Sequence, residues 1–568
     1  MAKEVKVSNK KPTERIFTPA YTMGEYNTVL ANHNDRIMLV WNEAGSVKEM
    51  TYAEFAQKVR TFAMGLTEKF GKFAGRKIVV MGETSAQWLI TYQAVILSGN
   101  VIVPMDKELA QEEISKFIDV ADASAVVYSA AFNKMYEEIA AEKDNLLLIP
   151  MDPNAAEGES KYPCASIFRD GENSALPYEP DTDTERCCEL LFTSGTTGTS
   201  KCVMLCQRNI FAAANAACAS VDFNKDDVIV SVLPVHHTYE LTCTFIAGPA
   251  YGMKICINDS IRHAVQNFKK FQPTALVLVP LFVTTMYKKI LTEAKKSGKD
   301  KILPAAIKAA NLMKRAGIDM SNKLFKDVRE AFGGRVEKIV CGGAALSPEL
   351  IQAFDAFGMA IYEGYGITEC SPLVAVTPYT KRKPGSVGPD VSCCQSRIEG
   401  TTTTDEGYIS GEIQVKGDNV MLGYMNNDEA NAAAFTDDGW YRTGDVGYKD
   451  KDGYIHITGR MKSVIVLDNG KNVFPEEIEE YLEGIDMIAE SVVVGREEED
   501  GTKLIAVIFP NYEKYPDMDE NAFRTEIQKQ IAALNKKLPS FKQIHKLEFR
   551  KTEFEKTTSK KIKRHVVK

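Results

Sequence analysis

The segment from Thr193 to Lys201 reads TSGTTGTSK and combines six hydroxyl side chains, two glycines and one lysine. Phosphate binding needs backbone N–H groups and hydroxyls that converge on oxygen, together with a cation that balances the charge. The spacing differs from the P-loop GxxxxGK[ST], because Gly195 and Gly198 lie elsewhere and Cys202 follows the lysine. A polar turn between buried segments is the alternative. The composition favours phosphate contact of a kind other than a P-loop.

The end of the chain is strongly basic. Between Lys551 and Lys568 there are seven Lys or Arg residues and two acidic ones, Glu553 and Glu555. A solvated tail explains such a run, and so does a segment that reaches towards an anionic ligand. Charge alone leaves both interpretations open.

The composition is that of a globular protein with several cooperating units. The chain has 568 residues, 44% apolar and 26% charged, and a domain usually holds ~150 residues. A formal charge of −8, from 69 Lys and Arg against 77 Asp and Glu, argues against nucleic acid as a partner. No apolar run reaches the ~18 residues of a membrane helix, and the polar start MAKEVKVSNKK predicts a cytoplasmic protein. The twelve cysteines lack CxxC pairs, so we expect reduced thiols and no structural zinc.

Strands and helices must position these residues, and their pattern predicts an α/β fold. KIVVM at 77–81, a helix over 85–98 and VIVPM at 101–105 form a βαβ unit. Similar apolar strands recur at 227–234, 253–257, 274–279 and 336–341, with room for crossover helices between them. We therefore expect helix-covered, mostly parallel sheets.

Open sheets of this kind bind ligands outside the carboxyl ends of their strands. The segments at those places are TSGTTGTSK, LPVHHTYE, GGAALSPEL and GYGITE. In the third, Ser347 and Pro348 predict the N-cap and first turn of a helix. These four segments are the candidates for a common site.

From about residue 385 the sequence pattern changes to short segments of alternating apolar and polar residues with glycine turns, which predict β hairpins. Beyond Arg460 we expect a hairpin that turns at Asn469-Gly470, a helix that begins at Pro475, two strands and a helix near 520–537. A boundary at Gly459 to Lys462 divides the chain into domains of residues 1–459 and 460–568.

The string TSGTTGxxK resembles the signature loop of the adenylate-forming superfamily, which includes acyl-CoA synthetases, firefly luciferase and the adenylation domains of peptide synthetases. Eight further strings follow in that superfamily's order. They are LPVHHTYE (233–240), CGGAAL (341–346), YEGYGITE (362–369), GSVG (385–388), GEIQVKG (411–417), WYRTGDVG (440–447), DGYIHITGRMKSVIV (452–466) and KTTSKKIKR (556–564). The resemblance implies a large N-terminal domain of mostly parallel sheets with a small β-barrel-like part, and a small mobile α+β C-terminal domain.

The resemblance also implies the reaction and its cofactors. A carboxylate attacks the α-phosphate of ATP in the presence of Mg²⁺, which gives acyl-AMP and pyrophosphate, and the thiol of CoA then takes the acyl group. The β and γ phosphates would be gripped by Thr193, Ser194, Gly195, Thr196, Thr197, Gly198 and Lys201.

The strings after the central strands are implied to hold the nucleotide and the metal. Tyr365 would lie against adenine, Thr368 would contact the α-phosphate, and Glu369 would hold Mg²⁺, a metal that usually takes one or two protein carboxylates. The adenine wall would be completed by Gly342, Gly343, Ala344 and Gly366.

The resemblance assigns four further residues. Asp445 matches the ribose-binding carboxylate, and Arg460 would reach the nucleotide from the domain junction. Lys462 matches the hinge position. His237 matches the histidine beside the acyl pocket, where we expect it to shape or gate the pocket without acting as an indispensable base, because a carboxylate is already ionised at neutral pH.

In the basic tail, Lys561 aligns with the adenylation lysine, which bridges the attacking carboxylate and the α-phosphate. The tail departs from the usual pattern, because Lys560 replaces a glycine and Glu555 a proline, so Lys560 stays a second candidate. CoA contacts are expected around Gly470, Lys471 and Asn472. Two other departures, Cys202 for glycine and Gln207 for histidine, remove no phosphate ligand.

The strings also bear on the substrate. LPVHHTYE lacks the aspartate with which adenylation domains pair an amino group, and together with SVIVLDNGKNVFPEEIE it looks most like medium- to long-chain fatty acyl-CoA ligases. A fatty acid, ATP and CoA are the expected partners, with possible peripheral membrane contact through the lipid substrate. The apolar stretch 277–283 could line a lipid tunnel, although plain core gives the same pattern. Two alternatives stay open: an enzyme that loads a carrier protein, and a catalytically silent nucleotide- or acyl-binding protein.

Overall fold

The protein is described by a computed structural model that covers residues 17–158, 160–193, 200–467, 472–498, 501–515, 518–556 and 562–567. Several predicted residues lie outside these ranges. They are Ser194, Gly195, Thr196, Thr197, Gly198, Gly470, Lys471, Lys560 and Lys561.

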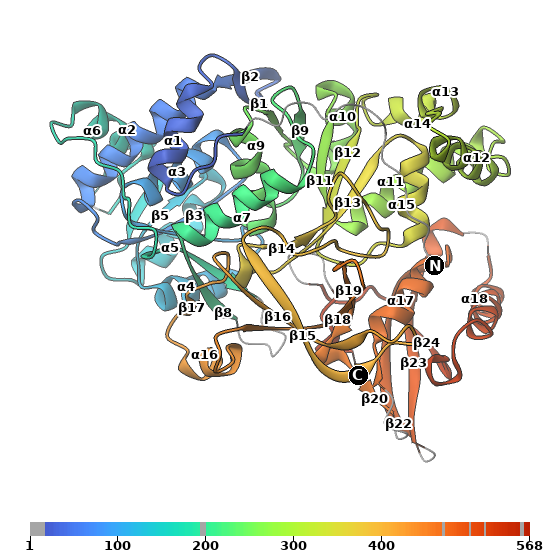
Figure 1. Cartoon of the computed structure of the whole chain (residues 1–568). Helices are drawn as coiled ribbons and strands as arrows, with labels where there is room; N and C mark the ends of the chain where they lie inside the picture. Colours follow the sequence, from blue (N-terminus) through green and yellow to red (C-terminus); the bar gives the residue numbers. More distant parts are fainter. Residues whose placement is uncertain are drawn as a thin grey trace.

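Two large, mostly parallel sheets make up the greater part of the molecule (Figure 1). In sheet order, the seven-stranded sheet consists of β17 (Gly423–Tyr424), β8 (Lys201–Cys206), β7 (Cys187–Thr193), β4 (Val101–Pro104), β3 (Lys77–Met81), β5 (Ala123–Tyr128) and β6 (Leu147–Pro150). The eight-stranded sheet consists of β14 (Leu373–Val376), β13 (Ala360–Gly366), β12 (Lys338–Gly342), β11 (Ala275–Leu278), β9 (Val228–Ser231), β10 (Lys254–Ile257), β1 (Ile37–Glu43) and β2 (Ser46–Thr51). The antiparallel pairs are β7–β8, β8–β17, β13–β14 and β1–β2, at or next to the sheet edges.

Both sheets are buried on both faces, which explains their continuous apolar strands. In β3, Ile78 and Val80 face the core between the sheets, while Val79 and Met81 face a second core. Helices cover these faces. They are α1 (Met23–Asn32), α2 (Tyr52–Phe70), α3 (Ala86–Leu97), α4 (Gln111–Ala121), α5 (Asn133–Ala141), α6 (Cys164–Asn173), α7 (Gln207–Ser220), α9 (Ala247–Ala250), α10 (Ala264–Phe271), α11 (Pro280–Lys296), α12 (Leu303–Arg315), α13 (Ser321–Leu324), α14 (Lys326–Ala331) and α15 (Pro348–Ala356).

Local signals in the sequence have the expected consequences. Strands β3 and β4 pair in parallel across α3, so the predicted βαβ unit is confirmed. Ser347 is the N-cap of α15, where its side chain accepts a hydrogen bond from the Leu350 N–H (3.3 Å), and Pro348 is the first helical residue. Among the described residues, no helix combines the length and apolarity needed to cross a bilayer.

The hairpins after residue 385 form a four-stranded antiparallel sheet, which adjoins the two large sheets. Its strands, in order, are β15 (Cys394–Thr403), β16 (Ile409–Gly417), β18 (Tyr441–Lys449) and β19 (Ile455–Arg460), and α16 (Asp428–Ala434) lies between β17 and β18 in the chain. The predicted hairpins and the α/β class are thus confirmed.

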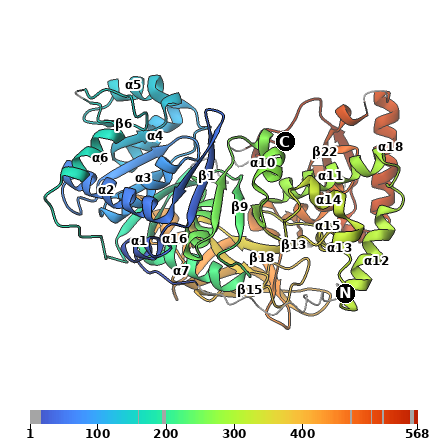
Figure 2. The same ribbon diagram turned by 90° about the horizontal axis from the view of Figure 1, so that it is seen from above.

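The C-terminal elements gather at one corner of the molecule and have a core of their own (Figures 1 and 2). They are β20 (Ile465–Val466), β21 (Asn472–Val473), α17 (Pro475–Glu483), β22 (Ile488–Glu498), β23 (Gly501–Pro510), α18 (Glu520–Asn535) and β24 (Lys546–Phe549). Strands β20 and β21 pair in antiparallel fashion, while the predicted turn at Asn469-Gly470 lies outside the described residues. The helix that begins at Pro475 and the later strands and helix are present.

Candidate functional site

The polar loop is a hairpin loop whose base is well defined. Strands β7 and β8 are antiparallel neighbours, with Thr193 opposite Lys201. The Thr193 hydroxyl donates to the Lys201 carbonyl oxygen at 3.4 Å. The loop residues themselves lie outside the described ranges, so their phosphate contacts stay a prediction. The pairing nevertheless brings Lys201 back beside the end of β7.

Tyr424 connects Lys201 to Glu369. The Lys201 ammonium lies 4.3 Å from the centre of the Tyr424 ring, and the Tyr424 hydroxyl donates to Glu369 Oε1 at 2.9 Å. The Tyr441 hydroxyl lies 3.3 Å from that of Tyr424. Burial, followed by the charge of Glu369, raises the pKa of Tyr424, so its phenol stays a neutral donor. Thr368 lies next to Glu369 in the short turn after β13.

The strand ends also bring Tyr365, Asp445 and Arg460 together. The Tyr365 hydroxyl donates to Asp445 Oδ2 at 2.6 Å, and Arg460 Nε lies 3.0 Å from Asp445 Oδ1. Asp445 and Arg460 face each other across β18 and β19. Tyr365 and Asp445 are buried, whereas the Arg460 side chain is half-exposed. A buried carboxylate held on both oxygens has a fixed orientation, which suits the recognition of a pair of hydroxyls.

The predicted glycine wall forms part of the lining of a cavity. The residues of this wall that line the cavity are Gly342, Gly343, Gly364, Tyr365 and Gly366. A Cβ at Gly366 would lie 2.3 Å from the Pro372 carbonyl oxygen, and Gly343 has a φ of +94°. These two positions therefore require glycine. Ala344 follows in an exposed turn at the edge of this wall.

The rest of the lining of the same cavity is mostly apolar. It consists of Ala217, Val221, Phe223, Tyr239, Cys243, Ala247, Val277, Val340, Pro372, Leu373 and Val376. Val277 belongs to the stretch 277–283 that could have been plain core, and it does line the cavity, while Leu278 and Val283 lie in a core on the other side of the sheet. An apolar group in this cavity would therefore extend directly from the glycine wall.

The segment LPVHHTYE contributes Tyr239 to the cavity wall, whereas His237 is not among the lining residues. His237 is the N-cap of α8 (Thr238–Glu240), and a π-helical turn, Leu241–Ile246, continues it. The cavity wall itself is made by the later Tyr239, Cys243 and Ala247. Glu240 is fully buried and accepts hydrogen bonds from Ser231 (2.5 Å) and Thr244 (3.1 Å). Burial raises its pKa to about 8, so this carboxyl anchors the segment in its neutral form.

His236, which had no assigned role, is partly buried beside His237. The two rings lie 4.3 Å apart, and His236 Nε2 is 3.5 Å from an Asp106 oxygen. Burial, and then the neighbouring His237, lowers the pKa of His236 to about 3. The ring therefore stays neutral and supports His237 by packing.

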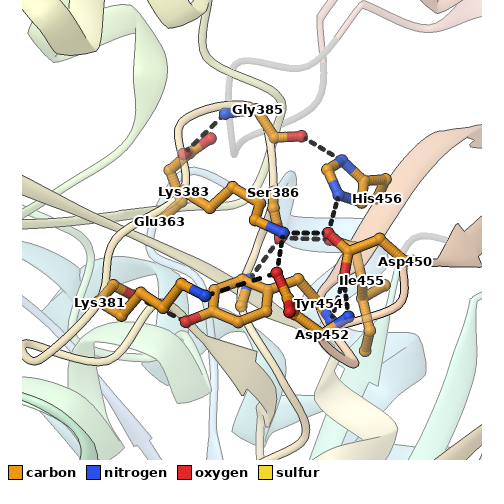
Figure 3. A network of polar contacts seen from close by, with 11 residues as sticks. Glu363, Lys381, Lys383, Gly385, Ser386, Asp450, Asp452, Tyr454, Ile455 and His456 are labelled. Carbon is orange, nitrogen blue, oxygen red and sulfur yellow. Dashed lines mark hydrogen bonds and ion pairs between the residues drawn. The ribbon is translucent and has the colours of Figure 1, made fainter. Parts of the chain in front are cut away.

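The loop that carries GSVG is tied to the β18–β19 hairpin by a polar network (Figure 3). Lys383 forms ion pairs with Asp450 and Asp452. His456 contacts the Gly385 carbonyl oxygen through Nδ1 (2.9 Å) and Asp450 through Nε2 (3.2 Å). The same hairpin carries Asp445 and Arg460, so this network fixes the strands that position those two side chains.

The domain junction follows directly on this hairpin. Strand β19 ends at Arg460, and the single turn Met461–Ser463 that contains Lys462 leads into β20. Met461 is half-exposed. Lys462 thus lies in a short exposed connection between two packed regions, as a hinge requires. Of the predicted CoA contacts, Asn472 lies in β21.

The lysine-bearing tail is anchored on both sides of Lys561. Lys556 and Ile562 form an antiparallel bridge, and the Lys563 N–H donates to the Glu555 carbonyl oxygen at 2.8 Å. Arg564 forms an ion pair with Glu479 of α17. The described residues on either side of positions 557–561 are therefore paired with each other and held on the C-terminal domain.

Two family models divide the chain in a way that decides its family. The model of the AMP-binding enzyme matches residues 27–425, and that of the AMP-binding enzyme C-terminal domain matches residues 462–568. The chain belongs to the AMP-binding enzyme family. The suspected membership of the adenylate-forming superfamily is confirmed.

Relatives of this AMP-binding enzyme include ligases of long-chain fatty acids. It is 30% identical over 512 residues to the long-chain-fatty-acid–CoA ligase FadD15 of Mycobacterium bovis, covering 84% of this chain and 82% of that one. It is 26% identical over 558 residues to the long-chain-fatty-acid–[acyl-carrier-protein] ligase AEE15 of Arabidopsis thaliana, covering 86% and 76%. ATP-bound MatB from Rhodopseudomonas palustris superimposes with a TM-score of 0.73 at 24% identity, over 95% of this chain and 98% of that one. This last likeness shows the shared fold.

The site of the AMP-binding enzyme contains two residues that sequence reasoning missed, Tyr424 and Tyr441. Tyr441 belongs to the string WYRTGDVG and is close to Asp445 in the sequence. This closeness could have indicated that Tyr441 lies in the site. Tyr424 is placed by the pairing of β17 with β8. No local pattern announces that contact, because the two strands are far apart in the chain.

Proposed function

We propose that this AMP-binding enzyme is an AMP-forming acyl-CoA synthetase that activates a long-chain fatty acid with ATP and transfers the acyl group to CoA. The apolar part of the cavity fits an acyl chain, and the glycine wall with Tyr365 and Asp445 fits the adenosine. The names of FadD15 and AEE15, both ligases of long-chain fatty acids, support the same substrate class. The twelve cysteines form no disulfide, which favours a reducing compartment such as the cytoplasm.

In the first half-reaction, the protein mainly positions charges. Asp445, held by Tyr365 and Arg460, accepts the ribose hydroxyls and sets the depth of the nucleotide in the cavity. Lys201 neutralises the β,γ end of ATP, which leaves as pyrophosphate. The fatty acid carboxylate is ionised at neutral pH, so it attacks the α-phosphorus without a general base. Lys561 would approach from the C-terminal domain and bridge the two reacting groups.

The donor set fits a magnesium ion that arrives with the substrate. Among the described residues, no three His, Cys, Asp or Glu side chains are grouped closely enough to hold a metal. Glu369 offers one carboxylate beside Lys201 and Tyr424, and Mg²⁺ commonly fills its remaining positions with phosphate oxygens and water. When bound, the ion would neutralise phosphate charge as it develops on the leaving group. Tyr424 orients the Glu369 carboxylate through its hydroxyl.

In the second half-reaction, a rotation about Lys462 would withdraw Lys561 and admit CoA. The short turn Met461–Ser463 joins a region framed by the polar network to a C-terminal region with its own core. Two independently packed bodies joined by one turn can change orientation without unfolding either. Removal of the lysine clears the path for the thiol.

The single observation that carries the proposal is the continuity of the glycine wall and the apolar cavity. The test is a panel of carboxylic acids from C2 to C18, scored by AMP release with and without CoA. We expect AMP, with the highest rate for long acyl chains, and acyl-CoA only when CoA is present. Release of ADP in place of AMP would refute adenylation, and a preference for C2 to C4 would refute the substrate class.

A carrier-protein acceptor is the second candidate, and the relationship to AEE15 motivates it. The two acceptors differ in one measurement. Acyl-AMP is first formed on the enzyme without an acceptor, and either CoA or a phosphopantetheinylated carrier protein is then added. Rapid discharge by free CoA supports the first proposal, and discharge by the carrier protein alone supports the second.

A further inference from the structure

Helix α12 presents an outward face on which apolar and basic side chains lie side by side. Ile302, directly before the helix, and Leu312 within it are 64% and 68% exposed. We call this face the α12 ridge. Its exposed residues are Lys301, Ile302, Ala305, Lys308, Ala309, Leu312 and Arg315. At 100° per residue, Lys301, Lys308 and Arg315 line one edge of the ridge, and the apolar side chains fill the rest.

The opposite face of α12 is fixed, so the ridge cannot turn inward. Leu303 and Ala310 are buried in the core. The Asn311 amide donates to the Gln352 carbonyl oxygen of α15 at 2.9 Å, and the Lys314 ammonium donates to the Asp355 carbonyl oxygen at 2.9 Å. The exposure of Ile302 and Leu312 is therefore a property of the folded state. Figures 1 and 2 both place α12 at the outer edge of the molecule.

The end of α12 extends the apolar surface. The Ile318 N–H donates to the Met313 carbonyl oxygen and the Gly317 N–H to that of Lys314, both at 3.0 Å. With Gly317 at a φ of +84°, this is a Schellman motif, which fixes the chain beyond the helix. Such motifs usually cover the following apolar residue, yet Ile318 stays 54% exposed. A third aliphatic side chain thus lies beyond the end of the ridge.

The segment around the ridge is the basic part of an acidic protein. From Lys288 to Lys326 the chain has eleven Lys or Arg residues and three acidic ones, a net charge of +8. The rest of the chain then holds 58 of the 69 basic residues and 74 of the 77 acidic ones. The charge of the molecule is therefore polarised, with the exposed aliphatic side chains on its positive part.

We propose that the α12 ridge binds the surface of a membrane that contains anionic phospholipids. Basic side chains beside exposed aliphatic ones are the combination by which a helix lies on a bilayer, with the apolar groups at the acyl boundary and the cations at lipid phosphates. A folded acidic protein would need a shape that matches the ridge, whereas a fluid lipid surface adapts to a protruding helix. The ridge contains none of the residues of the catalytic site, so the proposal does not depend on the acyl-CoA synthetase activity.

The test is flotation of the full chain with vesicles of phosphatidylcholine alone and with vesicles that also contain phosphatidylglycerol. We expect binding to the anionic vesicles that weakens with salt. A Lys301→Glu, Lys308→Glu, Arg315→Glu variant should bind them roughly tenfold or more weakly, because each basic residue near such a surface strengthens binding by about fivefold. An Ile302→Ser, Leu312→Ser variant should also bind the anionic vesicles more weakly. The binding that remains should still weaken with salt, because the basic residues are unchanged.

Matched controls use exposed residues far along the chain. The control for charge is one variant that combines Lys48→Glu, Lys116→Glu and Lys134→Glu. The control for apolar surface combines Val47→Ser and Leu176→Ser. Both should bind vesicles as the unchanged protein does. AMP release with a water-soluble carboxylate and no vesicles should be the same in all variants, so loss of vesicle binding is separable from loss of activity.

Three results would overturn the proposal. The first is equal binding of the ridge and control variants to anionic vesicles, and the second is no vesicle binding by the unchanged protein. The third is that the unchanged protein binds an acidic carrier protein and no vesicles, and that the charge-reversal variant loses this binding.

Discussion

The nucleotide end of the site and the lysine-bearing tail are built in opposite ways. Tyr365 and Asp445 are buried in the main core, and each is tied to the other and to neighbouring strands. The tail instead packs Phe554 and Ile562 onto a small separate cluster of the C-terminal sheet. One set of residues is held in place by the largest core of the molecule, and the other is attached to a region with separate, smaller cores.

This difference matches the chemistry that each part would perform. A nucleotide must be held throughout the reaction, so a preformed site avoids the entropy of ordering side chains at each step. In the proposed mechanism, Lys561 is needed in only one half-reaction and leaves before the thiol enters. A separate core with a single-turn connection allows both.

Lys561→Ala should give the largest effect and tests whether the tail acts in one half-reaction only. We expect acyl-AMP formation to fall by on the order of 10²–10³, the usual loss when one charge-stabilising donor is removed. Formation of acyl-CoA from supplied acyl-AMP should change little. The measurements are pyrophosphate release and thioester formation. Lys560→Ala tests the second candidate in the same way, and Lys551→Ala, at an exposed position, is the control. An equal loss in both half-reactions would contradict the role assigned to Lys561.

Tyr424→Phe tests the part of the site that is held by the main core, because it removes the hydroxyl that orients Glu369. Without its hydroxyl, Glu369 loses a hydrogen bond of about 1–1.5 kcal/mol, so AMP formation should fall by about tenfold. The Mg²⁺ concentration that gives the half-maximal rate should rise, because Glu369 is then less well oriented. This readout is diagnostic, since loss of a merely structural residue would leave it unchanged. Tyr408→Phe, remote from Glu369, is the control. An unchanged Mg²⁺ dependence would remove Tyr424 from the site.

Arg564→Ala should loosen the tail without touching the nucleotide. Its ion pair with Glu479 is partly exposed, and such pairs contribute about 1 kcal/mol or less. Adenylation should therefore slow by about threefold to fivefold, with the second half-reaction unaffected. Arg524→Ala, which removes an exposed ion pair with Glu520 on α18, serves as the comparison. If both variants slow adenylation alike, the tail anchor has no special part.

Glu240→Gln should have the smallest effect, which is a change in how the thermal stability of the core region depends on pH. The pKa of Glu240 is raised by burial to about 8 in the folded protein, against 4.5 as its ordinary value. The contribution of neutral Glu240 to the free energy of unfolding is thus fully present below pH 4.5 and is lost as the pH rises towards 8. Glutamine cannot ionise, so the variant should lose less Tm between pH 5 and pH 8.5, by roughly 2–4 °C. Glu406→Gln, at an exposed position, should behave like the unchanged protein in thermal unfolding.

Much of the fold could be predicted from local patterns. The strand–helix–strand unit at 77–105, the cap at Ser347 and the helix that begins at Pro475 all depend on contacts within a few residues. For the same reason the hairpins after residue 385 were recognisable, since alternation and glycine turns are local. The strings that resemble the superfamily then indicated which residues to compare in the structure.

The sequence by itself determined the class of fold, the family and the candidate residues at the strand ends. Only the tertiary structure decided that Tyr424 joins Lys201 to Glu369, and that the glycine wall continues into an apolar cavity. It also decided that the apolar residues of α12 face outward while their neighbours pack on α15. Strand pairing and helix docking join segments tens to hundreds of residues apart. Local periodicity carries no information on which partner such a segment will meet, because the outcome depends on the packing of the whole core.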